Sequence, residues 1–143
     1  MVDQKVLDFL GKEMVAVLTV QLPFGAIHGA TMHFVHQSEP LELYFITESS
    51  SRKVAGLKSG KTQAAVVVGF SDEEMATLQM DGELQVVTDP TKVGQIKPIY
   101  YHKHPMSVKY EAEPGNMYLV FIPAWWRFTD FKVQPLVIIE NNK

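Results

Sequence analysis

Short runs of apolar residues separated by polar turns cover most of this chain, a pattern typical of β-strands rather than of long helices. The first run begins at Met14 and continues to Val20, and two others cover residues 30–36 and 41–47. A polar turn at residues 37–40 separates the second run from the third. This spacing predicts three consecutive antiparallel strands.

The second half of the chain predicts further strands, at residues 64–70, 77–87, 117–122, 125–131 and 133–139. Gly82 lies inside the second of these runs and predicts a β-bulge, because an interior glycine weakens regular pairing. Pro123 parts the third run from the fourth, and Pro135 limits the pairing of the last. The polar stretch 71–74 is predicted to be a turn.

Three segments have the spacing of short helices, at residues 3–10, 53–58 and 90–97. Asp3 and Asp89 are the expected N-caps of the first and the third. Gly11 is expected to stop the first helix, and Pro98 to end the third, because proline disfavours helix in the residue before it. Six or seven short strands with two or three helices predict a mainly β fold, a β-barrel with flanking helices, in one domain over residues 1–143.

The composition excludes several classes of function. The chain has 143 residues, of which 46% are hydrophobic and 20% charged, and its formal net charge is -3, so no basic field points to nucleic acid. It contains no cysteine, which excludes disulfides, thiolate metal ligands and a cysteine nucleophile. Its apolar stretches are too short to span a bilayer, and residues 1–13 lack the features of a signal peptide. We therefore expect a cytoplasmic protein that is not bound to a membrane.

The segment from Thr47 to Lys53 is a candidate binding site for an anion, because a predicted strand leads into a predicted helix there. The free N–H groups and the dipole at a helix start favour an anion. Thr47 and Ser51 carry hydroxyl donors, while Arg52 can bind phosphate oxygens in pairs and Lys53 adds a positive charge. The alternative is a serine-rich loop that caps a helix and leaves both basic residues in solvent.

This segment resembles the FMN-phosphate signature of pyridoxamine-5'-phosphate-oxidase-like split-barrel proteins. In that signature an apolar, aromatic strand ends in threonine, as residues 43–47 do here, and a Ser-Arg-Lys triplet then opens a helix, as at residues 51–53. The order of the other elements also matches, including residues 29–34 and 77–82. The resemblance implies a six- to seven-stranded antiparallel split barrel with a Greek-key-like order. It also implies a homodimer whose subunits share their FMN sites.

The resemblance further implies which positions contact FMN. The phosphate would be held by Ser51, Arg52 and Lys53, with Thr47 beside them. Ile46 would pack against the isoalloxazine ring. The strand that passes along this ring would act mostly through its backbone groups, and it contains Ala30, Thr31, Met32 and His33.

A second set of positions would complete the same site. Thr77 and Gln79 share a strand face and would approach the ribityl chain or the pyrimidine side of the flavin. Trp125, Trp126 and Arg127 would close over the flavin from the second subunit. The alternative for these three residues is a place in the interface or in the core.

The five histidines do not predict a metal site. His102 and His104 have no cysteine or evident carboxylate partner at ligand spacing, so they are expected to be ordinary surface residues. His28 and His33 lie around the strand expected beside the flavin. Each can either stabilise negative charge on the reduced ring or have a purely structural role.

The substrate is not specified by these motifs. True pyridoxamine phosphate oxidases carry Arg and Lys near the positions that Thr31 and His36 occupy here, so that activity is not expected. We expect an FMN-dependent oxidoreductase that acts on a small molecule, with no catalytic residue assigned. The alternatives are a non-catalytic, stress-related flavin-binding protein and the same fold with the deazaflavin F420 or haem as its ligand.

Overall fold

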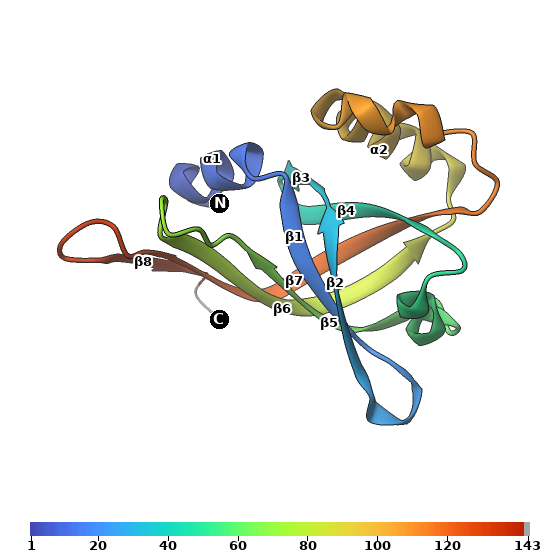
Figure 1. The fold of residues 1–143 in the computed structure, drawn as a ribbon, viewed down its shortest axis with the longest axis horizontal. Coiled ribbons are helices and arrows are strands. Elements are labelled where there is room, and N and C mark those ends of the chain that lie inside the picture. The colour runs from blue at the N-terminus through green and yellow to red at the C-terminus, as the bar shows by residue number, and fades with distance from the viewer. Residues whose placement is uncertain (142–143) are drawn as a thin grey trace.

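The protein is built on one strongly curved antiparallel β-sheet (Figure 1). The computed structural model describes residues 1–141. Its strands are β1 (Val15–Gln21), β2 (Ile27–His33), β3 (Val35–Ser38), β4 (Leu41–Glu48), β5 (Lys61–Val68), β6 (Ala76–Val87), β7 (Asn116–Asp130) and β8 (Val137–Glu140). Their order in the sheet is β2-β1-β5-β6-β7-β4-β3, and β8 pairs with β7 outside this path. The predicted antiparallel split barrel is confirmed, with eight strands in the described chain rather than six or seven.

Helices flank the sheet at both of its ends (Figure 1). They are α1 (Gln4–Lys12), α2 (Pro90–Lys103) and three short 3₁₀-helices, η1 (Pro23–Gly25), η2 (Arg52–Leu57) and η3 (Pro105–Tyr110). The predicted N-caps are confirmed, because the carboxylates of Asp3 and Asp89 accept hydrogen bonds from backbone N–H groups at 2.8 and 3.0 Å. Within residues 1–141, no helix is both long and apolar enough to cross a membrane.

The two edges of the sheet meet at Phe34, where the predicted strand at residues 30–36 is interrupted. β2 and β3 follow each other in the chain, yet they lie at opposite ends of the strand order. Strict alternation of inward and outward side chains fails here because Phe34 and Val35 are both buried. The chain therefore leaves one edge of the sheet and begins the other, which gives the barrel its split.

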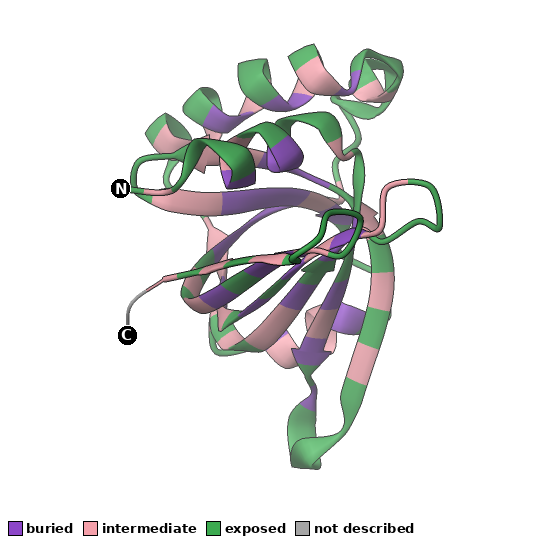
Figure 2. Ribbon diagram, turned by 90° about the vertical axis from the view of Figure 1, so that its left-hand side faces the viewer, coloured by how far each residue is buried: buried purple, intermediate pink, exposed green. Residues whose placement is uncertain are grey.

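Buried residues recur along the strands and on parts of the helices (Figure 2), and their side chains form two clusters on the two faces of the sheet. Along β4, Leu43 and Phe45 point into the main core inside the curve, whereas Tyr44 and Ile46 point into a second core beneath α2. Strand β4 and residues 118–121 of β7 are therefore buried on both faces. The outer face of β2, β1 and β5 has no such helix over it and keeps exposed side chains.

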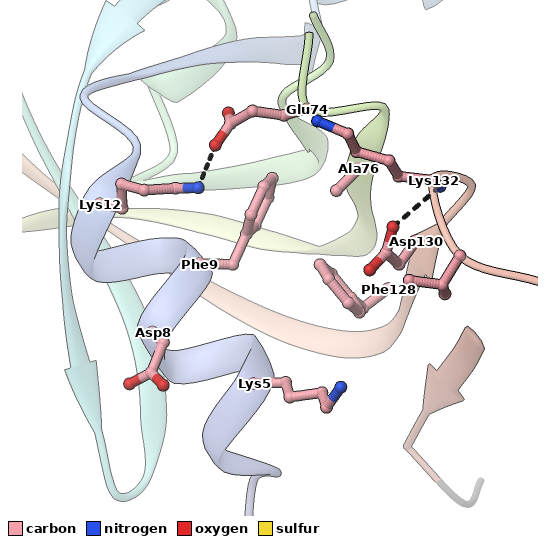
Figure 3. Close-up of a pocket in the computed structure, with 10 residues that line it drawn as sticks. Lys5, Asp8, Phe9, Lys12, Glu74, Ala76, Phe128, Asp130 and Lys132 are labelled. Carbon is pink, nitrogen blue, oxygen red and sulfur yellow. Dashed lines mark hydrogen bonds and ion pairs between the residues drawn. The ribbon is translucent and has the colours of Figure 1, made fainter. Parts of the chain in front are cut away.

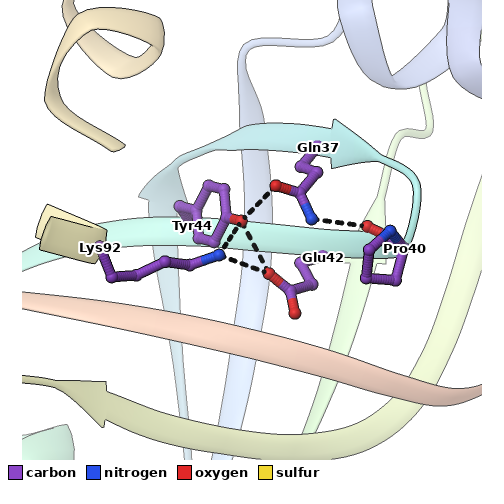
Figure 4. Close-up of polar contacts among 5 residues, drawn as sticks. All are labelled: Gln37, Pro40, Glu42, Tyr44 and Lys92. Atoms are coloured by element: carbon purple, nitrogen blue, oxygen red, sulfur yellow. Dashed lines mark hydrogen bonds and ion pairs between the residues drawn. The ribbon is translucent and has the colours of Figure 1, made fainter. Parts of the chain in front are cut away.

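A polar network attaches the start of α2 to the β3–β4 hairpin (Figure 4). The Tyr44 hydroxyl donates to Glu42 Oε1 at 2.7 Å and accepts from Lys92 Nζ at 3.0 Å. Lys92 also donates to Glu42 Oε1 at 3.2 Å. These contacts fix α2 over the outer face of β4, beside the segment that carries the candidate anion site.

The α-helices extend further than their sequences predict. Helix α1 includes Gly11 and ends at Lys12, and α2 runs through Pro98 instead of ending before it. Proline in a helix interior loses one hydrogen bond to residue i−4 and crowds its carbonyl. In α2 that residue is Gly94, and the burial of Ile96 and Tyr100 in the second core holds the helix together.

The predicted strands at residues 117–122 and 125–131 are a single strand, β7. Pro123 does not interrupt it because the register of β6 against β7 shifts between Asp81 and Gly82, opposite this proline. At a bulge, the backbone nitrogen of the extra residue does not have to donate a hydrogen bond to the neighbouring strand. Proline, which has no N–H, is therefore tolerated there. The predicted bulge at Gly82 is confirmed, and it is the reason why the two segments join.

Two glycine substitutions should affect stability in opposite directions. A Cβ at Gly82 would lie 2.9 Å from Pro123 Cα and would also collide with the backbone carbonyl of Ile122, so Gly82→Ala should destabilise the fold by about 1–3 kcal/mol. Gly94 has open space around it inside α2, so Gly94→Ala should stabilise the fold by about 0.5–1 kcal/mol. Urea denaturation of both variants measures these changes. If the Gly82→Ala protein were as stable as the wild type, the close approach of the β7 backbone at the bulge would not be the reason why residue 82 is glycine.

Candidate functional site

Three polar side chains from the end of β4 and the start of η2 meet at one point. Lys53 Nζ donates to Thr47 Oγ1 at 3.1 Å and to Ser51 Oγ at 3.2 Å, and the two hydroxyls lie 3.1 Å apart. Thr47 is at the end of the strand, and Ser51 directly precedes η2. The turn between the two elements thus brings the predicted residues together. We call Thr47, Ser51 and Lys53 the anion site.

Lys53 is buried without a negative partner. Its exposed fraction is 6%, and no carboxylate of the residues that the structure describes lies within 4.0 Å of its ammonium. Burial lowers the pKa of Lys53 below its ordinary value, because the charged form loses hydration. An unpaired buried ammonium is costly to keep, and a phosphate group would supply the charge that this site lacks.

Arg52 and Lys53 point to different environments although they are adjacent in sequence. Arg52 is exposed, and its guanidinium makes no ion pair with residues 1–141. The segment after Ser51 is a six-residue 3₁₀-helix instead of an α-helix. A helix this short has little dipole, so the anion site depends on the ammonium and the two hydroxyls.

The strand expected to run along the flavin, β2, forms an edge of the sheet. It pairs with β1 through the register Val17↔Thr31, and its other edge has no strand partner within the described chain. Thr31 and His33 are exposed on the outer face, whereas Ala30 and Met32 are half-buried. β2 also contacts η2, the short helix that begins next to Ser51.

Thr31 belongs to a row of side chains that crosses the outer face of five strands. The registers join Thr31 to Val17, Val17 to Val67, Val67 to Gln79 and Gln79 to Arg127. With about 4.8 Å between neighbouring strands, Thr31 and Gln79 are about 14 Å apart. Gln79 and Arg127 are therefore neighbours within one chain.

The three residues at 125–127 divide between the two faces of β7. Trp126 is 7% exposed and packs in the main core. Trp125 and Arg127 lie on the outer face, where the guanidinium is 5.5 Å from the indole ring and Arg127 Nε donates to Glu140 Oε2 at 2.7 Å. Nearby, the Thr77 hydroxyl donates to the Val68 carbonyl at 3.2 Å.

Trp125 is too far from Thr47 for both to hold one small molecule in a single chain. Thr47 pairs with Met117, and Trp125 follows eight residues later on the same strand. At roughly 3.3 Å per residue, this separates them by about 26 Å along β7. A site that uses both ends of β7 therefore needs two copies of the chain.

No three His, Asp or Glu side chains gather into a group that could hold a metal ion within residues 1–141. The expectation of a surface position is wrong for His104, which is 4% exposed and whose Nε2 donates to the Phe34 carbonyl at 2.7 Å. Burial lowers the pKa of His104, which favours the neutral ring. The His33 ring stacks on it with 4.8 Å between centroids, so His104 and His33 pack against the junction between β2 and β3.

Sequence reasoning missed the tyrosines that surround the far side of Thr47. A pocket of about 140 Å³ lies between the end of β4 and the end of α2, and its lining includes Tyr100, Tyr101 and Tyr110. The signal was present as the Tyr100–Tyr101 pair near the end of a helix. Without the course of α2 through Pro98, nothing related this pair to the anion site.

A larger pocket, of about 470 Å³, lies between α1 and the ends of β6 and β7 (Figure 3). Phe9, Ala76 and Phe128 provide its apolar part, and charged residues of both signs surround them, including the ion pair of Lys12 with Glu74. None of the lining residues belongs to the anion site. The mixed charges favour neither an anion nor a cation.

Comparisons with known proteins identify the fold. No family model matches this sequence, and a search of curated proteins finds no match. Similar solved structures include a Clostridium acetobutylicum protein related to general stress protein 26 of Bacillus subtilis and assigned to the pyridoxinephosphate oxidase family (16% identity, TM-score 0.67, 97% of this chain and 96% of that one). They also include General Stress Protein 26 of Bacillus anthracis (16%, 0.67, 87% and 91%) and a conserved hypothetical protein of Mycobacterium tuberculosis (13%, 0.76, 100% and 93%). At these identities the likeness establishes the fold.

The unpaired ammonium of Lys53 should cost stability. Replacing it by a neutral side chain removes a buried charge and leaves Thr47 and Ser51 bonded to each other, so Lys53→Met should be at least as stable as the wild type at pH 7. Because the native pKa lies below the ordinary 10.5, this advantage should shrink as the pH rises from 7 to 10 and the wild-type lysine loses its proton.

Urea denaturation at pH 7 and pH 10 measures the difference between the two proteins. Lys58→Met, at an exposed neighbouring position, is the control and should change little at either pH. Marked destabilisation of Lys53→Met at pH 7 would show that Lys53 has a structural role instead.

Proposed function

We propose that this chain, which has the split-barrel fold of pyridoxamine-5'-phosphate-oxidase-like proteins, binds FMN at sites shared between the two subunits of a homodimer. The observation that carries this proposal is the buried ammonium of Lys53, bonded to the hydroxyls of Thr47 and Ser51 and lacking a carboxylate within the described residues. These are the groups that bind a phosphate ester.

A phosphate at the anion site would bring together the groups that the structure holds there. The ammonium would face a negative oxygen, and the hydroxyls of Thr47 and Ser51 would turn their hydrogens to the others. Arg52 is exposed and adjacent, so its guanidinium is free to close over the phosphate from the solvent side. FMN has such a phosphate at the end of its ribityl chain.

The ring of FMN would extend from the anion site along the free edge of β2. That edge offers backbone N–H and C=O groups without a strand partner in residues 1–141, which suits the polar edge of a flavin. The resemblance also predicts a ring contact from Ile46, but this side chain points to the α2 side of β4. When bound, FMN supplies the transfer of hydride or electrons, and this chain supplies binding and orientation.

A second copy of the chain is the proposed occupant of the uncovered outer face. Residues 14–38 contain no Asp, Glu, Lys or Arg, although Val15, Val17, Phe24 and Ile27 in them are 40%, 41%, 106% and 74% exposed. A charge-free hairpin with an exposed edge strand is a surface that proteins normally cover. The distance between Thr47 and Trp125 along β7 also requires two chains if both contact one flavin.

Catalysis is the less constrained part of the proposal. An FMN-dependent oxidoreductase acting on a small molecule is the activity that we favour, because the Clostridium acetobutylicum neighbour is assigned to an oxidase family. A stress-related flavin-binding protein without turnover is the alternative, and the neighbours described as general stress protein 26 favour it. No catalytic residue of this chain is assigned.

Removal of the basic pair should abolish FMN retention. The double substitution of Arg52 and Lys53 by Ala should weaken FMN binding by about 3–6 kcal/mol, or roughly 10²- to 10⁴-fold in Kd, because two charge-assisted contacts are lost. Quenching of flavin fluorescence measures Kd, and Lys58→Ala is the matched control.

Three results would separate the alternatives for the ligand and the activity. Unchanged FMN affinity in the double variant, or a colourless wild type that ignores added FMN, would reject the cofactor proposal. Competition among FMN, F420 and haem identifies the ligand. A bound flavin that no nicotinamide donor reduces favours the non-catalytic protein.

A charge on the outer face should separate the subunits. Val17→Asp would bury a carboxylate in the proposed interface, so the variant should be a monomer by light scattering and should lose FMN together with the dimer. Met106→Asp, at an 80% exposed residue of η3, is the control and should stay dimeric. A Val17→Asp dimer that keeps full FMN affinity would show that this face is not the interface.

A further inference from the structure

The pocket beside Thr47 has a lining of tyrosines that the proposed FMN site does not use. It lies on the α2 side of β4, and Ile46, Thr47 and Glu48 form one wall while Tyr100 and Tyr101 form another. Thr47 therefore belongs to the anion site and also lines this pocket. We call it the tyrosine pocket.

Tyr100 has a hydroxyl without a partner in the described chain. The residue is only 5% exposed, and its side chain packs in the second core. No fully buried side-chain oxygen or nitrogen in residues 1–141 lacks a hydrogen bond, so this unpaired hydroxyl keeps contact with open space. Tyr100 lines the tyrosine pocket, so we infer that its hydroxyl faces this space.

The pocket offers hydrogen-bond donors and no positive charge. Burial raises the pKa of Tyr100 to about 12 and raises the pKa of Tyr101 as well, so both phenols keep their protons at neutral pH. Glu48 lines the pocket and disfavours an anion there. Lys97, the nearby cation, is held by Glu111 at 3.2 Å and does not line the pocket.

The aromatic walls and the volume limit the size and polarity of a ligand. About 140 Å³ suits a molecule with one ring. Tyr100 and Tyr101 present their rings at 76° to each other with 5.4 Å between centroids, so they form a corner against which a flat ligand can pack. A neutral ring would pack against the aromatic walls, and an oxygen acceptor on it would accept a hydrogen bond from the free Tyr100 hydroxyl.

We propose that the tyrosine pocket binds an uncharged single-ring molecule through a carbonyl-type oxygen that accepts a hydrogen bond from Tyr100. Binding itself does not depend on FMN.

Acetophenone, a neutral ketone with one ring, is the probe, and benzoate is its charged counterpart. NMR signals of the tyrosine rings are followed while each compound is added to the full-length protein, with and without saturating FMN. Acetophenone should shift the Tyr100 and Tyr101 signals saturably, and benzoate should bind more weakly. Tyr100→Phe should weaken acetophenone binding about 2- to 12-fold, as expected for the loss of one hydrogen bond.

Two further variants keep the test decisive. Ser107→Trp fills the pocket from a half-exposed position and should abolish the shifts even if Tyr100→Phe does not fold. Ser59→Ala removes a hydroxyl that donates to the Lys61 carbonyl outside the pocket and should leave acetophenone binding unchanged.

The possible failures of the two proposals are distinct. Absence of a saturable shift, benzoate binding as tight as that of acetophenone, or displacement of acetophenone by FMN would overturn the tyrosine pocket as a separate site. A protein that binds acetophenone but never FMN would retain the pocket and reject the cofactor proposal.

Discussion

The buried ammonium of Lys53 is the constraint around which the rest of the site is organised. The fold places it against the hydroxyls of Thr47 and Ser51 and brings no described carboxylate within reach. A protein selected for stability alone would pair this charge or replace it, because removing a charge from water is expensive. The position is explained if the missing partner is an anionic ligand.

The surroundings of the Lys53 ammonium depend on which parts of the outer face of the sheet a helix covers. Helix α2 buries the outer face of β4 and β7, fixed by the network around Tyr44, and forms the tyrosine pocket on that side. The outer face of β2, β1 and β5 has no helix over it, and residues 14–38 carry no formal charge. On one side of the anion site, α2 covers the sheet. On the other side, the outer face of β2, β1 and β5 is uncovered, and we propose that a second copy of the chain packs there.

Several features required packing between distant segments and were not predictable locally. The division of the strand at residues 30–36 depends on the burial of both Phe34 and Val35, which breaks the alternation that the sequence pattern suggests. Helix α2 continues through Pro98 because its buried residues pack on the second core. For the same reason the tyrosine pocket could not be foreseen, since it needs the end of α2 beside β4.

The sequence by itself determined the positions of most strands, the caps at Asp3 and Asp89, the bulge at Gly82 and the grouping of Thr47, Ser51 and Lys53. These follow from side-chain periodicity, backbone preference and short spacing, which act over a few residues. Only the tertiary structure decided that Lys53 is buried and Arg52 exposed, and that Trp126 faces the core while Arg127 faces outward. Those outcomes depend on which distant strand or helix packs against each face, and the sequence around a residue does not specify that packing partner.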